Sequence, residues 1–193
     1  VFNGLSQTPY QEEQPTAPTG AYGRSKLAGE IMLADNLDRH VILRTSWVFG
    51  ATGNNFVKTM LRIGSQKAEV GVVNDQFGKP TFAGDIADAI VKIISKFEED
   101  EKFPWGTYHL SNNGECSWHD FAAAIFASGE KVQLLAKQPL LKALSSSEYP
   151  TPAKRPAYSI LCTTKLENVL EYQLPHWQDG LTKTCSSLAA QMD

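Results

Sequence analysis

Several features are scarce or missing in this sequence, and each absence excludes a class of protein. The 193 residues contain only three cysteines, Cys116, Cys162 and Cys185, and no C-x-x-C pair. That usage is typical of reduced thiols and not of a disulfide framework. No stretch approaches the roughly 18 consecutive apolar residues that a membrane span needs, and the first residues show no signal-peptide pattern. We therefore expect a cytoplasmic protein without membrane contact.

An excess of positive charge is also missing. Lys and Arg number 18 against 21 Asp and Glu, a formal net charge of −3, whereas proteins that bind nucleic acids usually carry a basic surplus. There is no G-x-S-x-G elbow and no Walker loop, so hydrolase and NTPase functions are not indicated. The four histidines, His40, His109, His119 and His176, form no recognisable metal set. We expect no zinc site, and each histidine to be a satisfied structural side chain.

What the sequence does contain is an alternation of helical and strand-like segments. Apolar spacing predicts helices over residues 21–36, 56–63 and 86–94, and strands over 40–46, 70–73 and 108–110. Leu27, Ile31 and Ala34 give the first helix an apolar stripe, and the first strand resembles one buried on both faces. Ser117 and Asp120 are spaced as an N-terminal cap of a further helix. The alternation predicts an α/β fold.

The sharpest local pattern is Tyr22-Gly23-Arg24-Ser25-Lys26, in which a tyrosine and a lysine stand four residues apart at a helix start. Side chains at this spacing share one helix face. A free phenol titrates near pH 10, and an ammonium group held close to it favours the phenolate. Such a pair can exchange a proton with a carbonyl or alcohol oxygen. Taken alone, the pattern also fits a surface tyrosine beside a solvated lysine.

The residues around this pair extend the pattern over the whole chain. Three blocks stand in the order of extended short-chain dehydrogenases/reductases: VFNG at 1–4, YGRSKLAGE at 22–30 and LRTSWVFG at 43–50. Three more narrow the likeness: NFVKTM at 55–60, VNDQFGKPT at 73–81 and RPAYS at 155–159. With these blocks the chain resembles the dTDP-4-dehydrorhamnose reductase family.

The resemblance implies an enzyme that passes a hydride from NADPH or NADH to the 4-keto group of dTDP-4-dehydro-6-deoxy-L-mannose, giving dTDP-L-rhamnose for cell-wall polysaccharide. It implies that Tyr22 donates the proton to the C4 oxygen and that Lys26 assists it while binding the nicotinamide ribose. Both residues would therefore be catalytic and cofactor-binding. It also implies that Trp47, Asn55 and Arg155 bind the substrate. A magnesium ion and a homodimer are compatible with the resemblance.

Elementary chemistry gives two of these residues a physical case. Trp47 follows a strand, where open α/β sheets bind ligands, and a flat ring can pack on a sugar face. The planar fork of Arg155 suits a diphosphate, and the loop from Pro152 to Pro156 would limit its freedom. The alternatives are a core-filling aromatic and a solvated arginine. Arg44, at a strand end, is expected to form a structural ion pair.

The glycine-rich turn of a dinucleotide site, G-x-G-x-x-G, is absent from these 193 residues, and only 21 residues precede Tyr22. The turn is needed to bind the cofactor pyrophosphate at a helix start. We therefore expect the natural start to lie upstream of Val1, and this segment to be truncated, inactive by itself and left with an exposed sheet edge.

For the architecture, the resemblance implies the C-terminal part of a Rossmann-like doubly wound parallel sheet plus a small α/β substrate-binding domain. Residues 1–49 and 82–112 would belong to the NAD(P)-binding Rossmann domain, and 50–81 and 113–193 to the substrate domain. Two alternatives stay open. One is a nucleotide-sugar epimerase or dehydratase of the same fold, and the other is a non-catalytic regulatory subunit such as the beta subunit of methionine adenosyltransferase. The presence of both Tyr22 and Lys26 favours catalysis.

Overall fold

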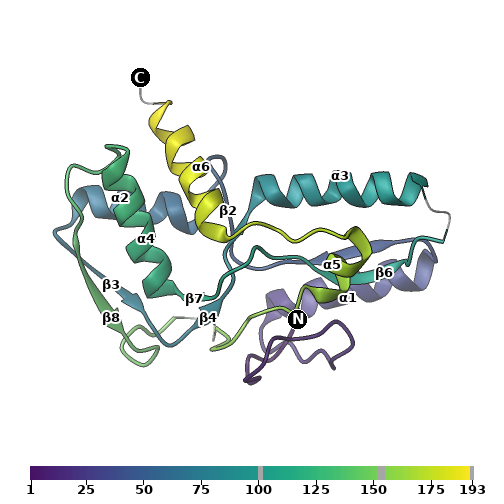
Figure 1. Ribbon diagram of the computed structural model, residues 1–193. Helices are drawn as coiled ribbons and strands as arrows, with labels where there is room; N and C mark the ends of the chain where they lie inside the picture. Colours follow the sequence, from purple (N-terminus) through teal and green to yellow (C-terminus); the bar gives the residue numbers. More distant parts are fainter. Residues whose placement is uncertain (100–101, 152–154, 192–193) are drawn as a thin grey trace.

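The structure is a computed structural model that describes residues 1–99, 102–151 and 155–191. Figure 1 shows an elongated molecule with one lobe around α1, α3 and α5 and another around α2 and α4. The elements are α1 (Ala21–Asn36), β1 (Val41–Arg44), β2 (Val48–Phe49), α2 (Phe56–Gln66), β3 (Glu69–Val73), β4 (Phe77–Gly78), β5 (Thr81–Phe82), α3 (Ala83–Glu99), β6 (Gly106–His109), β7 (Cys116–Ser117), α4 (Trp118–Lys131), β8 (Leu140–Leu144), α5 (Thr164–Leu170) and α6 (Trp177–Ala189).

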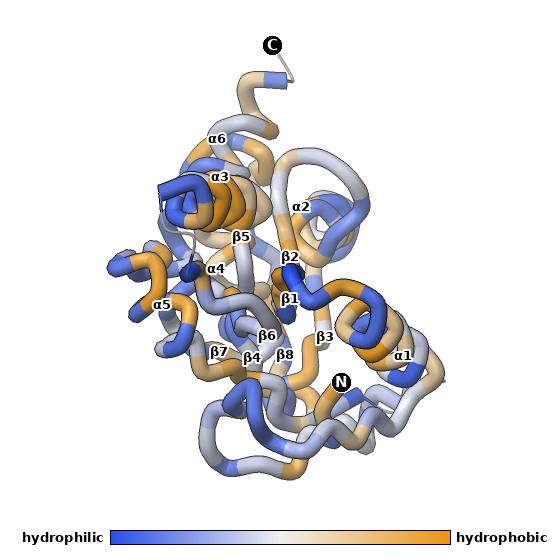
Figure 2. The backbone as a smooth tube through the Cα atoms, turned by 90° about the vertical axis from the view of Figure 1, so that its right-hand side faces the viewer, coloured by the Kyte–Doolittle hydropathy of each residue, from blue (hydrophilic) through white to orange (hydrophobic). Residues whose placement is uncertain are grey.

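The first lobe is built on the parallel pair β1 and β6, with Val41 opposite Gly106. Figures 1 and 2 show α1 and α3 on opposite sides of this pair, as in a doubly wound sheet. Its buried apolar cluster comprises Ala89, Ile93, Phe103, Tyr108, Leu110, Leu166 and Leu174. These residues come from α3, β6, α5 and the adjoining loops, so the core lies on the α3 side of the strands.

The second lobe combines the parallel pair β3 and β8 with helices α2, α4 and α6. Its larger core includes Phe49, Val57, Val70, Phe121, Ile125, Phe126, Trp177 and Leu181. Helix α4 begins with a full capping box, in which the Ser117 hydroxyl accepts from the Asp120 N–H and the Asp120 carboxylate accepts from the Ser117 N–H. The predicted N-terminal cap is confirmed.

Short strands and one buried polar pair join the lobes. β2 pairs in parallel with β5, and β4 pairs antiparallel with β7. Asn112, which follows β6, donates to Asp85 Oδ2 at 2.6 Å and accepts from the Phe82 N–H at 2.7 Å. Both Asn112 and Asp85 are buried. This contact ties the start of α3 to β5 and to the end of β6.

The expected helices and strands are present, but the expectation that the first strand is buried on both faces is wrong, and the apolar stripe of α1 is exposed. No residue of α1 is buried, and Ile31 of its apolar stripe is 52% exposed. Strand β1 is half-buried throughout and not buried on both faces. The physical reason is the same: within residues 1–99, 102–151 and 155–191, β1 pairs with β6 alone, and little packs against the outer face of α1.

The division into two domains stays a prediction. The two apolar clusters agree with two packing units, since one gathers around α3 and β6 and the other around α2 and α4. Leu166 and Leu174, which the predicted boundaries place in the substrate domain, pack in the cluster of the first lobe. Helix α5 thus contacts α3 and β6 although it follows 113 in the chain.

Candidate active site

Tyr22 and Lys26 lie on the first two turns of α1 and are both exposed, Tyr22 to 79%. Together they line a cleft of about 330 Å³. Arg44, Thr45 and Ser46, at the carboxyl end of β1, form another wall of the same cleft. The spacing of the two residues therefore brings both side chains to one cavity, as the sequence predicts. Their catalytic and cofactor-binding roles stay predictions.

One ion pair holds α1 against β1. Arg44 contacts the Glu30 carboxylate through Nη2 at 2.7 Å and through Nε at 3.1 and 3.0 Å. The two side chains are only 12% and 15% exposed, and charge-assisted contacts of this geometry are among the stronger hydrogen bonds in proteins. The expectation that Arg44 forms a structural ion pair is confirmed, and the pair fixes the helix that carries Tyr22 and Lys26.

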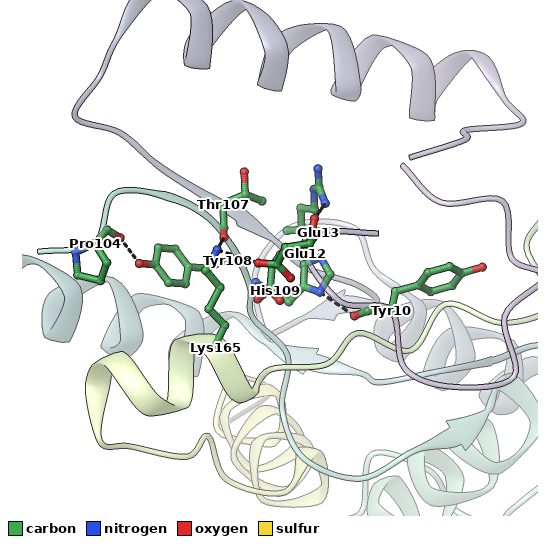
Figure 3. A network of polar contacts seen from close by, with 9 residues as sticks. Tyr10, Glu12, Glu13, Pro104, Thr107, Tyr108, His109 and Lys165 are labelled. Carbon is green, nitrogen blue, oxygen red and sulfur yellow. Dashed lines mark hydrogen bonds and ion pairs between the residues drawn. The ribbon is translucent and has the colours of Figure 1, made fainter. Parts of the chain in front are cut away.

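The loop before α1 is fastened to β6 by the contacts drawn in Figure 3. The His109 N–H donates to Glu12 Oε1 at 2.8 Å, and the His109 ring contacts the Tyr10 carbonyl through Nδ1 at 2.9 Å. Lys165 of α5 donates to the Thr107 carbonyl at 2.9 Å and lies 3.4 Å from Glu13. The loop that walls the cleft is thereby tied to both β6 and α5.

The expectation that every histidine side chain has its hydrogen bonds satisfied is wrong for His109. Because the Tyr10 carbonyl can only accept, Nδ1 carries the hydrogen and Nε2 is an acceptor, which has no partner among the described residues. Burial, aided by the Arg44 charge, lowers the pKa of His109 to about 4. Tyr10 and Cys162 backbone carbonyls and the Glu13 carboxylate oppose this shift. By contrast, His176 caps α6.

Trp47 follows Ser46 of the cleft and packs against the apolar core of the second lobe. Its ring stacks on Trp118, with centroids 3.5 Å apart and planes at 10°. A Cβ at Gly78 would collide with the indole, so that position has to be glycine for the ring to fit. Trp47 is half-buried. It packs in an aromatic cluster at the carboxyl end of β1, and its substrate contact stays a prediction.

Two further cavities continue from the cleft. Pro156 lines both the cleft of Tyr22 and a larger one of about 710 Å³. Arg155, Gln76 and Tyr149 line the larger one and also a pocket of about 310 Å³. The smaller pocket is walled by Phe56, Met60, Ile63, Val72, Val73 and Trp118, among others. Three adjoining cavities thus lead from the tyrosine and lysine to an aromatic pocket, with Arg155 at the last junction.

The other two residues predicted to bind substrate, Asn55 and Arg155, differ in how they are placed. Asn55 caps α2: its Oδ1 accepts from the Lys58 N–H at 3.2 Å, and its Nδ2 donates to the Gly50 carbonyl at 2.8 Å. Its polar atoms are already used locally, and its role toward substrate stays a prediction. Arg155 is exposed, while residues 152–154 of the loop expected to restrain it lie outside the described residues.

Sequence reasoning missed the aromatic walls. Phe56, Trp118 and Tyr149 line the smallest cavity, and of the three only Phe56 lies in one of the sequence blocks, NFVKTM at 55–60. A signal for Trp118 was available, since it follows the Ser117 cap and stands three residues before Phe121 on the same helix face.

In the described part of the chain, no three His, Cys, Asp or Glu side chains are placed to hold a metal ion. Across the same residues, no helix is both long and apolar enough for a membrane span.

Comparison with known proteins decides the family. The family model described as "RmlD substrate binding domain" matches residues 1–190. The chain belongs to this family. The predicted resemblance to dTDP-4-dehydrorhamnose reductases is thereby confirmed.

Relatives of this RmlD-type domain carry that enzyme name. This chain is 42% identical over 181 residues to dTDP-4-dehydrorhamnose reductase of Aggregatibacter actinomycetemcomitans, and the alignment covers 94% of this chain and 62% of the relative. Against the enzyme of Salmonella typhimurium it is 40% identical over 188 residues, with 97% and 62% covered. The chain spans about 62% of the length of these curated relatives.

Solved structures agree with the α/β fold. The Bacillus anthracis dTDP-4-dehydrorhamnose reductase, solved in complex with NADP, superposes with a TM-score of 0.86 at 37% identity, covering 97% of this chain and 62% of that one. A UDP-galactose 4-epimerase superposes with a TM-score of 0.74 at 22% identity, covering 100% and 61%, and shows the likeness of fold alone. The predicted fold class is confirmed.

Proposed function

We propose that this chain supplies the catalytic tyrosine and lysine and the nucleotide-sugar site of an NAD(P)H-dependent dTDP-4-dehydrorhamnose reductase, which reduces dTDP-4-dehydrorhamnose to dTDP-L-rhamnose. One observation carries the proposal: three adjoining cavities lead from Tyr22 and Lys26, past Arg155, to a pocket walled by aromatic rings. The names of the relatives favour this reductase over the epimerase, dehydratase and regulatory-subunit alternatives.

The proposed ligand matches the cavities in order. A nucleotide-sugar has a sugar at one end, a doubly charged diphosphate in the middle and a flat base at the other end. The sugar would lie in the cleft of Tyr22, and the diphosphate would face the guanidinium of Arg155. The thymine would enter the pocket of Phe56, Trp118 and other apolar side chains, where rings can stack on a base.

The chemistry asked of this chain is a proton transfer. A reduced nicotinamide, when bound, supplies the hydride. Tyr22 is exposed and lines the cleft, and its hydroxyl would give a proton to the C4 oxygen of the sugar. Lys26, on the same helix face, would favour the phenolate left behind and hold the cofactor ribose. These two side chains fit the nicotinamide end of a cofactor, while no glycine-rich pyrophosphate turn occurs in the 193 residues.

The proposal also includes a cytoplasmic site of action and a homodimer. The free cysteines, Cys116, Cys162 and Cys185, support a reducing compartment. Exposed apolar side chains on α1, among them Ile31 and Met32, support a partner surface. Magnesium is not part of the proposal, since the described residues bring no three acidic, histidine or cysteine side chains together.

Calorimetry with dTDP and NADPH, titrated separately into the 193-residue chain, tests the proposal. We expect dTDP to bind and NADPH to bind weakly or not at all. Arg155→Ala should weaken dTDP about 10- to 100-fold, because a charge-assisted hydrogen bond to phosphate is lost. Arg62→Ala is the matched control, because Arg62 is exposed on α2 and lines none of the three cavities. A result in which the chain does not bind dTDP but binds NADPH tightly would contradict the proposal.

A further inference from the structure

A buried glutamine stands where the larger cavity meets the aromatic pocket. Gln76 lines both cavities, as Arg155 and Tyr149 do. Those two residues are exposed, whereas Gln76 is only 8% exposed. Binding pockets are mostly apolar, and a few polar groups in fixed positions give them specificity. The orientation of the Gln76 amide therefore bears on which ligands the pocket accepts.

The register of β3 and β8 places a serine close to this amide. The two strands lie side by side (Figure 1) and pair in parallel, with Val73 opposite Leu144. The Asn74 N–H extends the pairing by donating to the Leu144 carbonyl at 2.8 Å. Asp75 and Ser146 each stand two residues beyond the last paired position of their strand. The parallel register therefore brings Asp75 and Ser146 together.

Asp75 binds Ser146 with both carboxylate oxygens. Oδ2 accepts from the Ser146 backbone N–H at 2.8 Å, and Oδ1 accepts from its hydroxyl at 2.7 Å. The backbone hydrogen bond and then the hydroxyl one lower the pKa of Asp75, so the carboxylate is ionised at neutral pH and can only accept. The one hydroxyl hydrogen of Ser146 is thereby used, and its oxygen is left as an acceptor.

This arrangement fixes the orientation of the Gln76 amide. Nε2 lies 2.8 Å from Ser146 Oγ. Because that oxygen accepts, the NH2 group of Gln76 has to face it, although the two ends of an amide have nearly the same shape. Among the described residues none donates to Oε1, and this atom is not one of the fully enclosed polar atoms without a partner. Oε1 is therefore an acceptor open to the cavities.

We propose that Gln76 recognises the base of the nucleotide: its Oε1 accepts from the N3–H of thymine in the aromatic pocket, and Asp75 and Ser146 hold the amide in that orientation. Ser146, which binds the amide nitrogen, lines the larger cavity and not the aromatic pocket. Thymine and uracil carry a hydrogen on N3, whereas cytosine has a lone pair there. An acceptor facing N3 therefore favours thymine and uracil and disfavours cytosine. The inference rests on the proposed function and adds the residue that determines base specificity.

Binding of two matched nucleotides tests the role of Gln76. The probes are dUDP and dCDP, which share the sugar, the diphosphate and the ring size, so they differ only at the edge of the base. Calorimetry measures the ratio of their dissociation constants. We expect dUDP to bind about 10- to 100-fold tighter than dCDP, because cytosine leaves Oε1 facing a lone pair. Gln76→Met keeps the size and removes the amide, so the two constants should then agree within about 3-fold.

Gln66→Met is the matched control for this substitution. Gln66 is exposed at the end of α2 and lines none of the three cavities. The ratio for dUDP and dCDP should therefore be the same in Gln66→Met as in the parent chain.

Asp75→Asn tests the hydrogen-bond chain by reversing it. The new amide can still accept from the Ser146 N–H, but its NH2 group donates to the Ser146 hydroxyl, which must then donate to Gln76. The Gln76 amide turns and presents its NH2 group to the base. We expect the ratio to shift by at least about 10-fold towards dCDP. Loss of the Asp75 charge affects both diphosphates alike and leaves the ratio unchanged.

The outcomes separate this inference from the proposed function. If the parent chain binds dTDP but does not discriminate dUDP from dCDP, or if Gln76→Met weakens both by the same factor, Gln76 is only a wall of the cavities. The inference is then overturned while the proposed function stands. An unchanged ratio in Asp75→Asn would overturn the fixed orientation of the amide. If the parent chain binds none of the three nucleotides, the proposed function fails, and this inference fails with it. A ratio that is lost in Gln76→Met and shifts towards dCDP in Asp75→Asn supports base recognition by Gln76.

Discussion

The two lobes differ in how their helices are held. Helix α4 of the second lobe buries five residues, Phe121, Ala122, Ile125, Phe126 and Gly129, and begins with a capping box. Helix α1 of the first lobe buries none and has no side-chain cap. The walls of the aromatic pocket thus belong to a well-packed core, whereas Tyr22 and Lys26 stand on a helix that one ion pair holds in place.

Under the proposed function, this difference separates the residues that would bind the ligand from those that would transfer the proton. Affinity for the nucleotide end of a ligand should depend on side chains whose positions the second core fixes. The alignment of the Tyr22 hydroxyl should depend on α1, where local opening requires little loss of apolar contact. Changes in the second core are therefore expected to be costly to folding, and changes at α1 to be mild for stability but direct in their effect on the cleft.

The largest effect is expected from Phe121→Ala. Phe121 is fully buried and contacts the rings of Trp47, Phe49, Phe56 and Trp177. Its removal should lower the free energy of unfolding by about 3–5 kcal/mol, measured by urea denaturation. Ile31→Ala on α1 is the control and should cost less than about 1 kcal/mol, because Ile31 is 52% exposed. Equal losses in the two variants would remove the contrast between the lobes.

The pH dependence of stability should come next in size and arise in the first lobe. The pKa of His109 is lowered to about 4 in the folded chain, against about 6.5 when unfolded. The unfolded state therefore binds more protons between these values, and stability is lost as the pH falls from 6.5 towards 4. The loss is on the order of 3 kcal/mol.

Urea titrations at pH 7, 6 and 5 measure the first part of this loss, about 2 kcal/mol, and they avoid the range where carboxylates protonate. His109→Gln removes the titrating ring, so its stability should vary much less over these pH values. The groups around the ring act against one another, with Arg44 disfavouring the charged form and Glu13 favouring it. A parallel pH dependence in the variant and the parent chain would assign the effect to other groups.

Local patterns were sufficient for much of the fold. The apolar spacing of 56–63 and 86–94 lies within α2 and α3, and the Ser117 and Asp120 pair marks the true start of α4. These features depend on residues three or four apart, which the sequence presents together. The Tyr22 and Lys26 pair is of the same kind, since one helix turn brings both residues to one cleft.

Contacts between residues far apart in the chain could not be predicted from such local patterns. The stack of Trp47 on Trp118 joins positions 71 residues apart, and its geometry follows from the packing of the segment after β1 on the core around α4. The apolar stripe of α1 was read correctly as a pattern, yet a pattern does not state what covers it. The unpartnered Nε2 of His109 likewise depends on a loop nearly a hundred residues earlier, at Tyr10.

The smallest effect, and the sharpest test of the contrast, is expected from Glu30→Gln. The variant leaves the half-buried Arg44 without its carboxylate, which should cost about 1–3 kcal/mol. The cost should appear as faster hydrogen exchange in α1, because the ion pair is the main tie of that helix to β1. Binding of dTDP should be unchanged, since neither residue lines the two cavities assigned to the diphosphate and the base.

Glu69→Gln is the matched control for this variant. Glu69 pairs with Lys142 at the same 2.7 Å, but both side chains are about half exposed, at 49% and 54%. Exposed ion pairs contribute about 0–1 kcal/mol because water screens them, so exchange in the neighbouring strands should hardly change. If Glu30→Gln leaves α1 as protected as before, or weakens dTDP as much as Arg155→Ala does, then helix α1 and the aromatic pocket are not held independently, and the contrast between the lobes fails.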